Sequence, residues 1–185
     1  MTSLLDPSGP PPGVLALAGN PRPGSRTLLV ARTVADQLAD RLHLGGTTAL
    51  DLADVAGELF AAEAPAADRY RAALAGAAVA VVATPVYKAS YTGLLKAFLD
   101  GLPTGGLRGV LAVPVVVSAS PAHSFAAEHL LRPLLVELGA LVPARPLALT
   151  EAQLGDLDAV VASWADEAAP LLARLVPAPV PGSDR

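Results

Sequence analysis

Two tyrosines, a lysine and several small hydroxyl residues lie in one short segment, residues 84–93, which directly follows the apolar run 77–83. The run predicts a buried strand, and the pattern that begins near Tyr91 predicts a helix. Ligands of open parallel sheets bind outside the carboxyl ends of strands, so the segment predicts a ligand-binding loop. With Tyr87 and Lys88, it suits a ligand that is flat, aromatic and partly polar. In the plainer interpretation, the tyrosines pack on the following helix and the lysine is solvated.

A second segment, residues 19–27, has the composition of an anion site. It leaves the first apolar run and opens the first helical pattern, where unpaired backbone N–H groups and the positive end of a helix dipole face outward. Short polar side chains and two cations lie there: Asn20, Ser25, Thr27, Arg22 and Arg26. The segment matches neither the G-x-G-x-x-G dinucleotide turn nor the phosphate loop of nucleotide triphosphatases. Alternatively, Ser25 simply caps the helix and the arginines are solvated.

Apolar runs alternate with helical patterns, which indicates an α/β fold with one five-stranded parallel sheet. The predicted strands are residues 14–18, 48–52, 79–83, 110–117 and 141–147, and the predicted helices are residues 26–42, 66–75, 91–102, 124–138 and 156–175. In a doubly wound sheet of order 2-1-3-4-5, helices cover both faces and the loops after strands one, three and four share one crevice. The third of these loops holds Ser118, Ala119 and Ser120. Pro114 conflicts with this scheme, because proline cannot donate to a ladder, and it predicts a bulged or less central fourth strand.

The predicted helix 124–138 contains Pro133. Its ring collides with the carbonyl of His129, four residues earlier, and it has no amide proton, at a cost of about 3 kcal/mol in a helix interior. The helix should therefore kink or widen near His129. A π-bulge is one solution, and such bulges often occur at functional sites.

Composition excludes several classes of function. The chain has 185 residues, 13 basic and 17 acidic side chains, a net charge of −4 and no cysteine. This excludes disulfides and thiolate ligands and offers no basic stripe for nucleic acid or a membrane surface. No signal-peptide pattern is present, and no apolar run approaches the roughly 18–20 residues that span a bilayer. We expect a cytoplasmic protein without a metal site, with one domain at residues 14–176 between Pro- and Gly-rich disordered tails, residues 1–13 and 177–185.

Four motifs carry a resemblance to a known family. They are Gly19-x-Pro21-Arg22-x-x-Ser25-Arg26-Thr27, then Thr84-Pro85-Val86-Tyr87-Lys88-Ala89-Ser90-Tyr91-Thr92-Gly93-x-Leu95-Lys96, then Ala122-His123, and Arg132-Pro133. From about residue 14 to about residue 149, the chain resembles the NAD(P)H-dependent FMN reductases of flavodoxin-like fold. The likeness is greatest to those that supply reduced flavin to sulfonate monooxygenases.

The resemblance implies roles for the three loops. The first loop would hold the FMN phosphate, Pro85, Val86, Tyr87 and Lys88 would lie along the isoalloxazine ring with Ser90 and Tyr91 beside them, and Ser118, Ala119 and Ser120 would border its pyrimidine edge. Two departures are present, because these reductases usually carry Ser at the position of Asn20 and Gly-Gly at Ser118-Ala119. The helix with Pro133 carries an inserted residue at the subunit interface in the sulfonate-linked members, and His129 falls at that place. We expect His129 to modulate flavin retention or assembly, or to mark a tolerated surface kink.

The expected activity is reduction of FMN by NADPH or NADH, through hydride transfer to flavin N5, with release of the reduced flavin to a partner monooxygenase. Such chemistry needs positioned rings and no acid or base from the protein. Arg22, Arg26, Lys88 and Arg108 are candidate contacts to the 2′-phosphate of NADPH. An FMN-bound quinone or azo-dye reductase and a flavodoxin-like electron carrier are the alternatives.

Two predicted helices carry more leucine than one narrow core stripe needs. The apolar positions are Leu94, Leu95, Phe98 and Leu102 on one helix and Leu130, Leu131, Leu134, Leu135 and Leu138 on the other. Together with the resemblance, they predict a homodimer or homotetramer.

Overall fold

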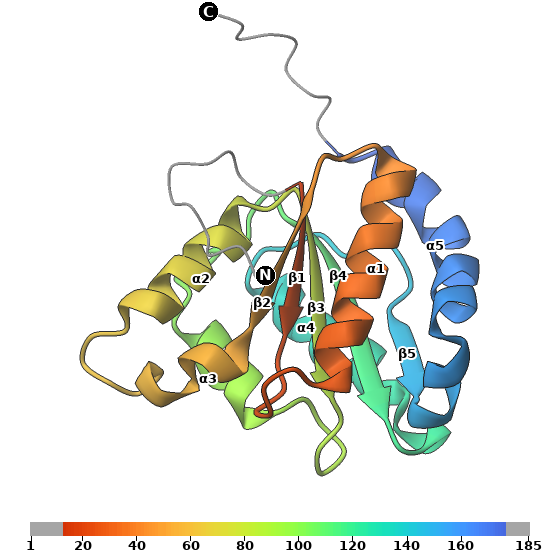
Figure 1. Ribbon diagram of the computed structural model, residues 1–185. Helices are drawn as coiled ribbons and strands as arrows, with labels where there is room; N and C mark the ends of the chain where they lie inside the picture. Colours follow the sequence, from red (N-terminus) through yellow and green to blue (C-terminus); the bar gives the residue numbers. More distant parts are fainter. Residues whose placement is uncertain (1–12, 177–185) are drawn as a thin grey trace, which may run out of the picture.

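The computed structural model describes residues 13–176 and has a five-stranded, all-parallel sheet at its centre (Figure 1). The strands are β1 (Val14–Ala18), β2 (Thr47–Asp51), β3 (Val79–Pro85), β4 (Leu111–Ser118) and β5 (Leu147–Thr150). Their order is β2-β1-β3-β4-β5, as predicted, and every neighbouring pair is parallel. The predicted flavodoxin-like fold is therefore confirmed. The predicted tails, apart from Gly13, lie outside the described residues.

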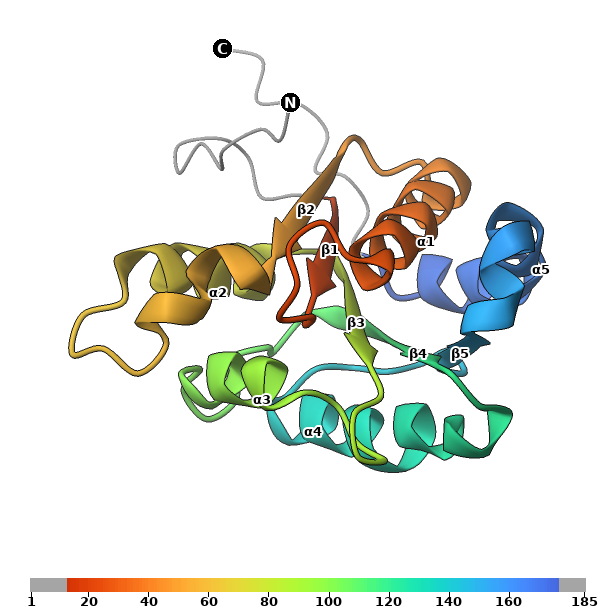
Figure 2. The same ribbon diagram turned by 60° about the horizontal axis from the view of Figure 1, so that its bottom comes forward.

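Helices cover both faces of the sheet, which Figure 2 shows most directly. The main helices are α1 (Arg26–Leu42), α2 (Pro65–Gly76), α3 (Gly93–Asp100), α4 (Arg132–Glu137) and α5 (Leu157–Ala173). Helices α1 and α5 pack on one face, and α2, α3 and α4 on the other. Shorter helical turns are Leu52–Glu58, Pro121–His123, Ala127–Leu131 and Glu151–Asp156.

The sheet separates two apolar layers. One contains Val30, Val34 and Trp164 from α1 and α5, and the other contains Phe98 and Leu135 from α3 and α4. Every residue of β3 and β4 is buried, as expected for parallel strands covered on both sides. The rigid sheet fixes the positions of the loops that leave its carboxyl edge.

The predicted fifth strand, residues 141–147, is wrong. The strand forms later, at Leu147–Thr150, and Leu141 makes an isolated bridge before the chain leaves the sheet. Pro143 and Pro146 explain the shift, because neither can donate a backbone hydrogen bond to β4. The apolar residues around these prolines have the pattern of a strand, but the backbone there cannot complete the hydrogen bonds of a sheet.

Pro114 neither bulges β4 nor moves it to an edge. It keeps register with Val82 of β3, and β4 lies between β3 and β5. Ala112 donates its N–H toward Leu141 on the β5 side, and alternation along the strand turns the nitrogen of Pro114 to that same side. Pairing with β5 starts at Val115, so no ladder bond is lost at Pro114.

The fourth predicted helix is interrupted, as Pro133 predicts. Residues Ala127–Leu131 form a π-helix and α4 begins at Arg132. The N–H of Arg132 reaches back to the oxygen of Ala127, five residues earlier, so the wider turn absorbs the missing amide of Pro133. The predicted π-bulge is therefore confirmed, and it includes His129.

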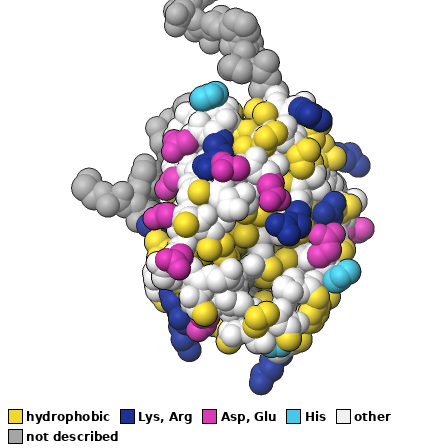
Figure 3. Space-filling view, turned by 90° about the vertical axis from the view of Figure 1, so that its right-hand side faces the viewer, with side chains coloured by type: hydrophobic (Ala, Val, Ile, Leu, Met, Phe, Trp, Pro, Cys, Tyr) yellow, Lys and Arg dark blue, Asp and Glu magenta, His cyan; other side chains and the backbone are white. Residues whose placement is uncertain are grey.

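The outer face over α1 and α5 carries interspersed acidic and basic side chains (Figure 3). Ion pairs there join Arg41 to Asp166 and Arg145 to Glu167. Exposed pairs of this kind contribute little to stability.

Candidate functional site

The loops that follow β1, β3 and β4 lie together at the carboxyl edge of the sheet, at the bottom of Figure 1. The first two of these loops are each hydrogen-bonded to the neighbouring strand where they begin. The N–H of Gly19 donates to the oxygen of Ala83 at 2.7 Å, and the N–H of Val86 donates to the oxygen of Val117 at 2.9 Å. The predicted convergence of the three loops is therefore present.

The side chain of Asn20 spans the first loop. It is 8% exposed, its Nδ2 donates to Oγ1 of Thr27 at 3.1 Å, and its Oδ1 accepts from the N–H of Arg22 at 3.0 Å. A serine, shorter by one atom and without the amide, could not make both contacts. Asn20 therefore sets the shape of the loop, and its hydrogen bonds are made within the protein.

Ser25 directly precedes helix α1 and caps it. Its Oγ accepts from the N–H of Leu28 at 3.3 Å, which is the structural role left open by the sequence. The first helix-closing bonds run from the N–H groups of Leu28 and Leu29 to the oxygen of Ser25. The N–H groups of Arg26 and Thr27 precede this ladder, in the position where helix N-termini bind anions.

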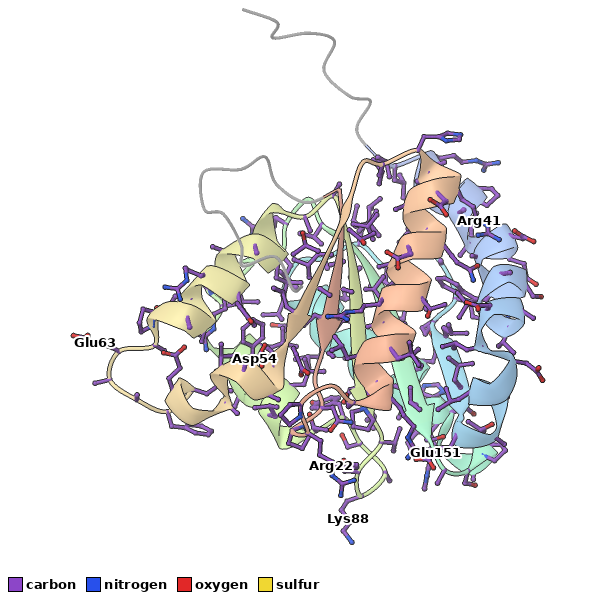
Figure 4. All side chains as sticks on the ribbon, viewed as in Figure 1. Arg22, Arg41, Asp54, Glu63, Lys88 and Glu151 are labelled. Atoms are coloured by element: carbon purple, nitrogen blue, oxygen red, sulfur yellow. The ribbon has the colours of Figure 1, made fainter. Side chains whose placement is uncertain are left out.

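The candidate cationic side chains differ in position and in pairing. Arg22 and Lys88 project from the carboxyl edge, at the bottom of Figure 4. Arg26 is paired, with its Nη2 2.9 Å from Oε1 of Glu151 on the segment after β5. Arg108 precedes β4 and therefore lies toward the opposite, amino edge of the parallel sheet, so the prediction that it could serve this site is wrong.

Sequence reasoning missed Asp51, the last residue of β2. The residue is 7% exposed, and its carboxylate accepts from the N–H of Gly24 at 2.9 Å and from that of Ala53 at 3.2 Å. Burial raises the pKa of Asp51, while these two backbone hydrogen bonds oppose the shift. An acidic residue at the carboxyl end of a strand beside an anion loop was the available signal. Asp51 fastens the tip of the first loop to the neighbouring strand.

The second loop contains a tight two-residue turn. Tyr87 and Ser90 exchange backbone hydrogen bonds of 2.9 and 3.1 Å, and the residues between them, Lys88 and Ala89, have φ of 51° and 64°. This is the geometry of a type I′ turn, which glycine and asparagine favour. Two non-glycine residues in the left-handed region store strain, and such strain clusters at functional sites.

Thr92 connects the first and second loops. Its Oγ1 donates to the oxygen of Gly19 at 2.5 Å and accepts from the N–H of Leu95, which caps α3. Its own N–H donates to Oγ1 of Thr84 at 3.2 Å. All of these groups are buried, so one hydroxyl holds the first and second loops in fixed relation. The Thr-Gly-Leu-Leu spacing before a helix was a capping signal in the sequence.

The two loop tyrosines have different environments. Tyr87 is 42% exposed, so its ring remains accessible at the turn. Tyr91 is partly buried and packs against the apolar layer below α3. Tyr91 therefore packs as the structural alternative describes, whereas the ring of Tyr87 stays open to solvent.

The third loop is held by its own serines. Ser118 is buried and its Oγ donates to the oxygen of Ser120 at 2.8 Å, while Oγ of Ser120 accepts from the N–H of Ala122 and caps the next turn. Ala119 between them is exposed. The loop therefore has room for the side chains of Ser118 and Ala119, which stand in place of the Gly-Gly pair.

His129 lies on the π-helix and is exposed.

Within residues 13–176, no three His, Asp or Glu side chains lie close enough together to hold a metal ion. Among residues 13–176, none of the helices combines the length and the apolar character of a membrane span.

The assembled edge offers backbone N–H groups at a helix start, cations, and an accessible aromatic ring in a strained turn. These are groups that meet a phosphate and a flat conjugated ring, and the sheet order places them at its switch point. Fold and site together define a flavodoxin-like, mononucleotide-binding α/β protein.

Comparison with known proteins specifies the family. Residues 12–154 match the model of the NADPH-dependent FMN reductases, and the chain belongs to this family. It is 35% identical over 130 residues to an FMN reductase (NADPH) of Escherichia coli strain K12, which covers 69% of this chain and 67% of that protein. It is 32% identical over 173 residues to the NADH-dependent FMN reductase SfnF of Pseudomonas fluorescens strain Pf0-1, covering 85% and 90% of the two chains.

A solved structure gives the same result. The apo form of the NADH:FMN oxidoreductase EMOB has a TM-score of 0.79 and 27% identity, with 91% of each chain covered. The resemblance read from the motifs is thus confirmed. The chain is an oxidoreductase of the FMN reductase family, with FMN and a nicotinamide nucleotide as its cofactors.

Proposed function

We propose that this enzyme catalyses hydride transfer from NADH or NADPH to N5 of FMN and releases the reduced flavin to a partner monooxygenase. The observation that carries the proposal is the convergence, at one edge of the sheet, of a helix start suited to a phosphate and a strained turn that presents an aromatic ring.

The first loop is the proposed phosphate site. Backbone N–H groups of Arg26 and Thr27 would donate to the phosphate, Arg22 and Ser25 would lie beside it, and Asn20 would hold the loop open at the required width. The buried hydrogen bonds of Asn20 support this, because a loop fixed in advance loses less conformational entropy on binding.

The second and third loops are the proposed ring site. Pro85, Val86, Tyr87 and Lys88 would line the isoalloxazine ring, with Ser90 and Tyr91 supporting the turn from behind. Ser118, Ala119 and Ser120 would border the pyrimidine edge. Support comes from the backbone bond between Val86 and Val117, which joins the second loop to the strand that leads into the third.

The flavin, when bound, supplies the hydride acceptor, and the protein supplies position. Asp51 is the buried acid near the loops, and both of its oxygens accept backbone hydrogen bonds. It is therefore committed to holding the first loop. The side chains that face the edge can orient two rings against each other, which is what hydride transfer requires.

Exposure of the second loop supports release of the product. Tyr87 is 42% exposed and Lys88 and Ala89 are exposed, so the turn does not enclose the site within one subunit. A flavin held at an open edge can exchange, which suits a protein that delivers reduced flavin to another enzyme.

Steady-state oxidation of NADH and NADPH, measured with and without added FMN, tests the proposal. Colourless purified protein with rapid oxidation on addition of FMN is the expected result. Tightly bound yellow flavin with electron transfer to quinones would instead indicate a quinone reductase, and slow oxidation under all conditions would indicate an electron carrier. Either result would overturn the proposal.

We further propose that the enzyme is a homodimer or homotetramer that associates through α3 and α4. Leu95, Phe98, Leu131 and Leu135 are fully buried in the core, whereas Leu94, Leu102, Leu130, Leu134 and Leu138 are only partly buried. Val136 on α4 is 51% exposed and Phe125, just before the π-helix, is 40% exposed. Sedimentation of the pure protein as a monomer at all concentrations would refute this assembly.

A further inference from the structure

A cavity lies between β5 and the segment that follows β4, beside the proposed flavin site. The cavity has a volume of about 360 Å³ and is lined by Ser118, Pro121, Ser124, Ala148, Leu149, Thr150 and Gln153. It shares Ser118 with the third loop of the site. Two other surface cavities formed by described residues lie elsewhere, one along α2 beside Gly101 and one between α1 and α5 near Arg41, and share no residue with the three loops.

The lining of this cavity suits a sugar. Hydroxyl groups of Ser118, Ser124 and Thr150 and the side-chain amide of Gln153 lie among small apolar surfaces. Gln153 uses its Oε1 to accept from the N–H and Oγ1 of Thr150 at 2.9 Å each, which fixes the amide and leaves its Nε2 as a donor. The volume lies at the low end of ligand sites, so the cavity has room for only part of a dinucleotide.

The rim of the cavity carries an ion pair. Glu151 lies between Thr150 and Gln153, and its Oε1 is 2.9 Å from Nη2 of Arg26, the first residue of α1. The two side chains are 45% and 63% exposed, so both remain accessible to a ligand. Figure 4 shows Glu151 at the same lower edge of the molecule as Arg22 and Lys88.

We propose that this cavity binds the adenosine ribose of the nicotinamide nucleotide and that Glu151 makes the enzyme prefer NADH. The inference rests on the proposed function. A nicotinamide stacked on the flavin places the rest of its dinucleotide along this edge, and the adjoining cavity supplies hydroxyl and amide partners. A carboxylate at the rim accepts from a free 2′-hydroxyl and repels a 2′-phosphate, and it also occupies the arginine that would bind that phosphate.

The comparisons do not distinguish NADH from NADPH as the preferred donor, because relatives named for NADPH and for NADH both match the chain. The pair of Arg26 and Glu151 joins residues 125 positions apart, so neither residue alone predicts the preference.

The test is the ratio of kcat/KM for NADH to kcat/KM for NADPH, with FMN saturating, in wild type, Glu151→Gln and Glu167→Gln. Glu167 is a matched control, since it is an exposed glutamate paired with Arg145 at 3.8 Å on the α5 side. We expect wild type to favour NADH, and Glu151→Gln to lower the ratio about fivefold or more by losing one exposed charge contact. The control should keep the wild-type ratio, and added salt should weaken the difference between wild type and Glu151→Gln.

Wild-type preference for NADPH, or an unchanged ratio in Glu151→Gln with normal turnover, would overturn this inference and leave the proposed function intact. An absence of FMN-dependent turnover with either nucleotide in wild type would overturn the proposed function itself. The FMN dissociation constant, measured in all three proteins, separates a change in nicotinamide choice from damage to the flavin site.

Discussion

Replacement of Thr92 by valine tests whether one hydroxyl holds the first and second loops together. Valine keeps the shape of threonine but has no hydroxyl, so the packing is retained while two hydrogen bonds are lost. The N–H of Leu95 loses its cap, and the buried oxygen of Gly19 loses the donor that lies 2.5 Å away.

The cost follows from these two losses. Loss of a helix N-cap costs about 1 kcal/mol, and an unsatisfied buried carbonyl costs about 1–3 kcal/mol. Together they give a loss of about 3 kcal/mol in the free energy of unfolding. For a chain of this size, each kcal/mol lowers Tm by about 2–4 °C, so the variant should melt about 6–12 °C lower.

Urea unfolding and a thermal scan of the same samples measure this loss, with Thr92→Ser as the control. Serine retains the hydroxyl and drops the methyl group, and it should remain within about 1 kcal/mol of wild type. FMN should bind less tightly to Thr92→Val than to Thr92→Ser, because the two loops are no longer fixed to one another. Equal stability losses in the two variants would show that the methyl group matters and would refute the reasoning.

Two further predictions concern the same loops. Burial raises the pKa of Asp51 above its ordinary value of 3.8, so the folded protein binds this proton more tightly than the unfolded chain does. The contribution of Asp51 to the free energy of unfolding should therefore fall as pH rises from about 3.8 through the raised pKa. Urea unfolding across that pH range should show this slope in wild type and lose it in Asp51→Asn; the same slope in both proteins would contradict it. Ala89 has φ of 64°, so Ala89→Gly should relieve left-handed strain of about 1–2 kcal/mol. The greater entropy of glycine in the unfolded chain offsets about 0.5–1 kcal/mol of this gain, so the free energy of unfolding should rise slightly. Ala89→Val should lower stability, and a thermal scan that ranks valine above glycine would exclude a strained turn.

Local rules explain the elements that sequence predicted well. Helix α1 begins and ends at the predicted residues, because Ser25 supplies its cap and the apolar spacing is regular. The wide turn around His129 follows from Pro133 and the carbonyl four residues before it. The fifth strand was misplaced because an apolar run predicts a strand, whereas Pro143 and Pro146 lack the N–H groups that a ladder needs.

The amino-acid sequence determined the order of strands and helices and the three segments that lie at the carboxyl edge, because these depend on apolar periodicity and turn residues close together in the chain. Tertiary structure decided the contacts that make the edge a site. Asp51 meets Gly24 from 27 positions away, Thr92 meets Gly19 from 73, and Glu151 meets Arg26 from 125. Asp51 ends β2, Thr92 follows β3 and Glu151 follows β5, so strand order and register bring these distant polar groups within hydrogen-bonding distance.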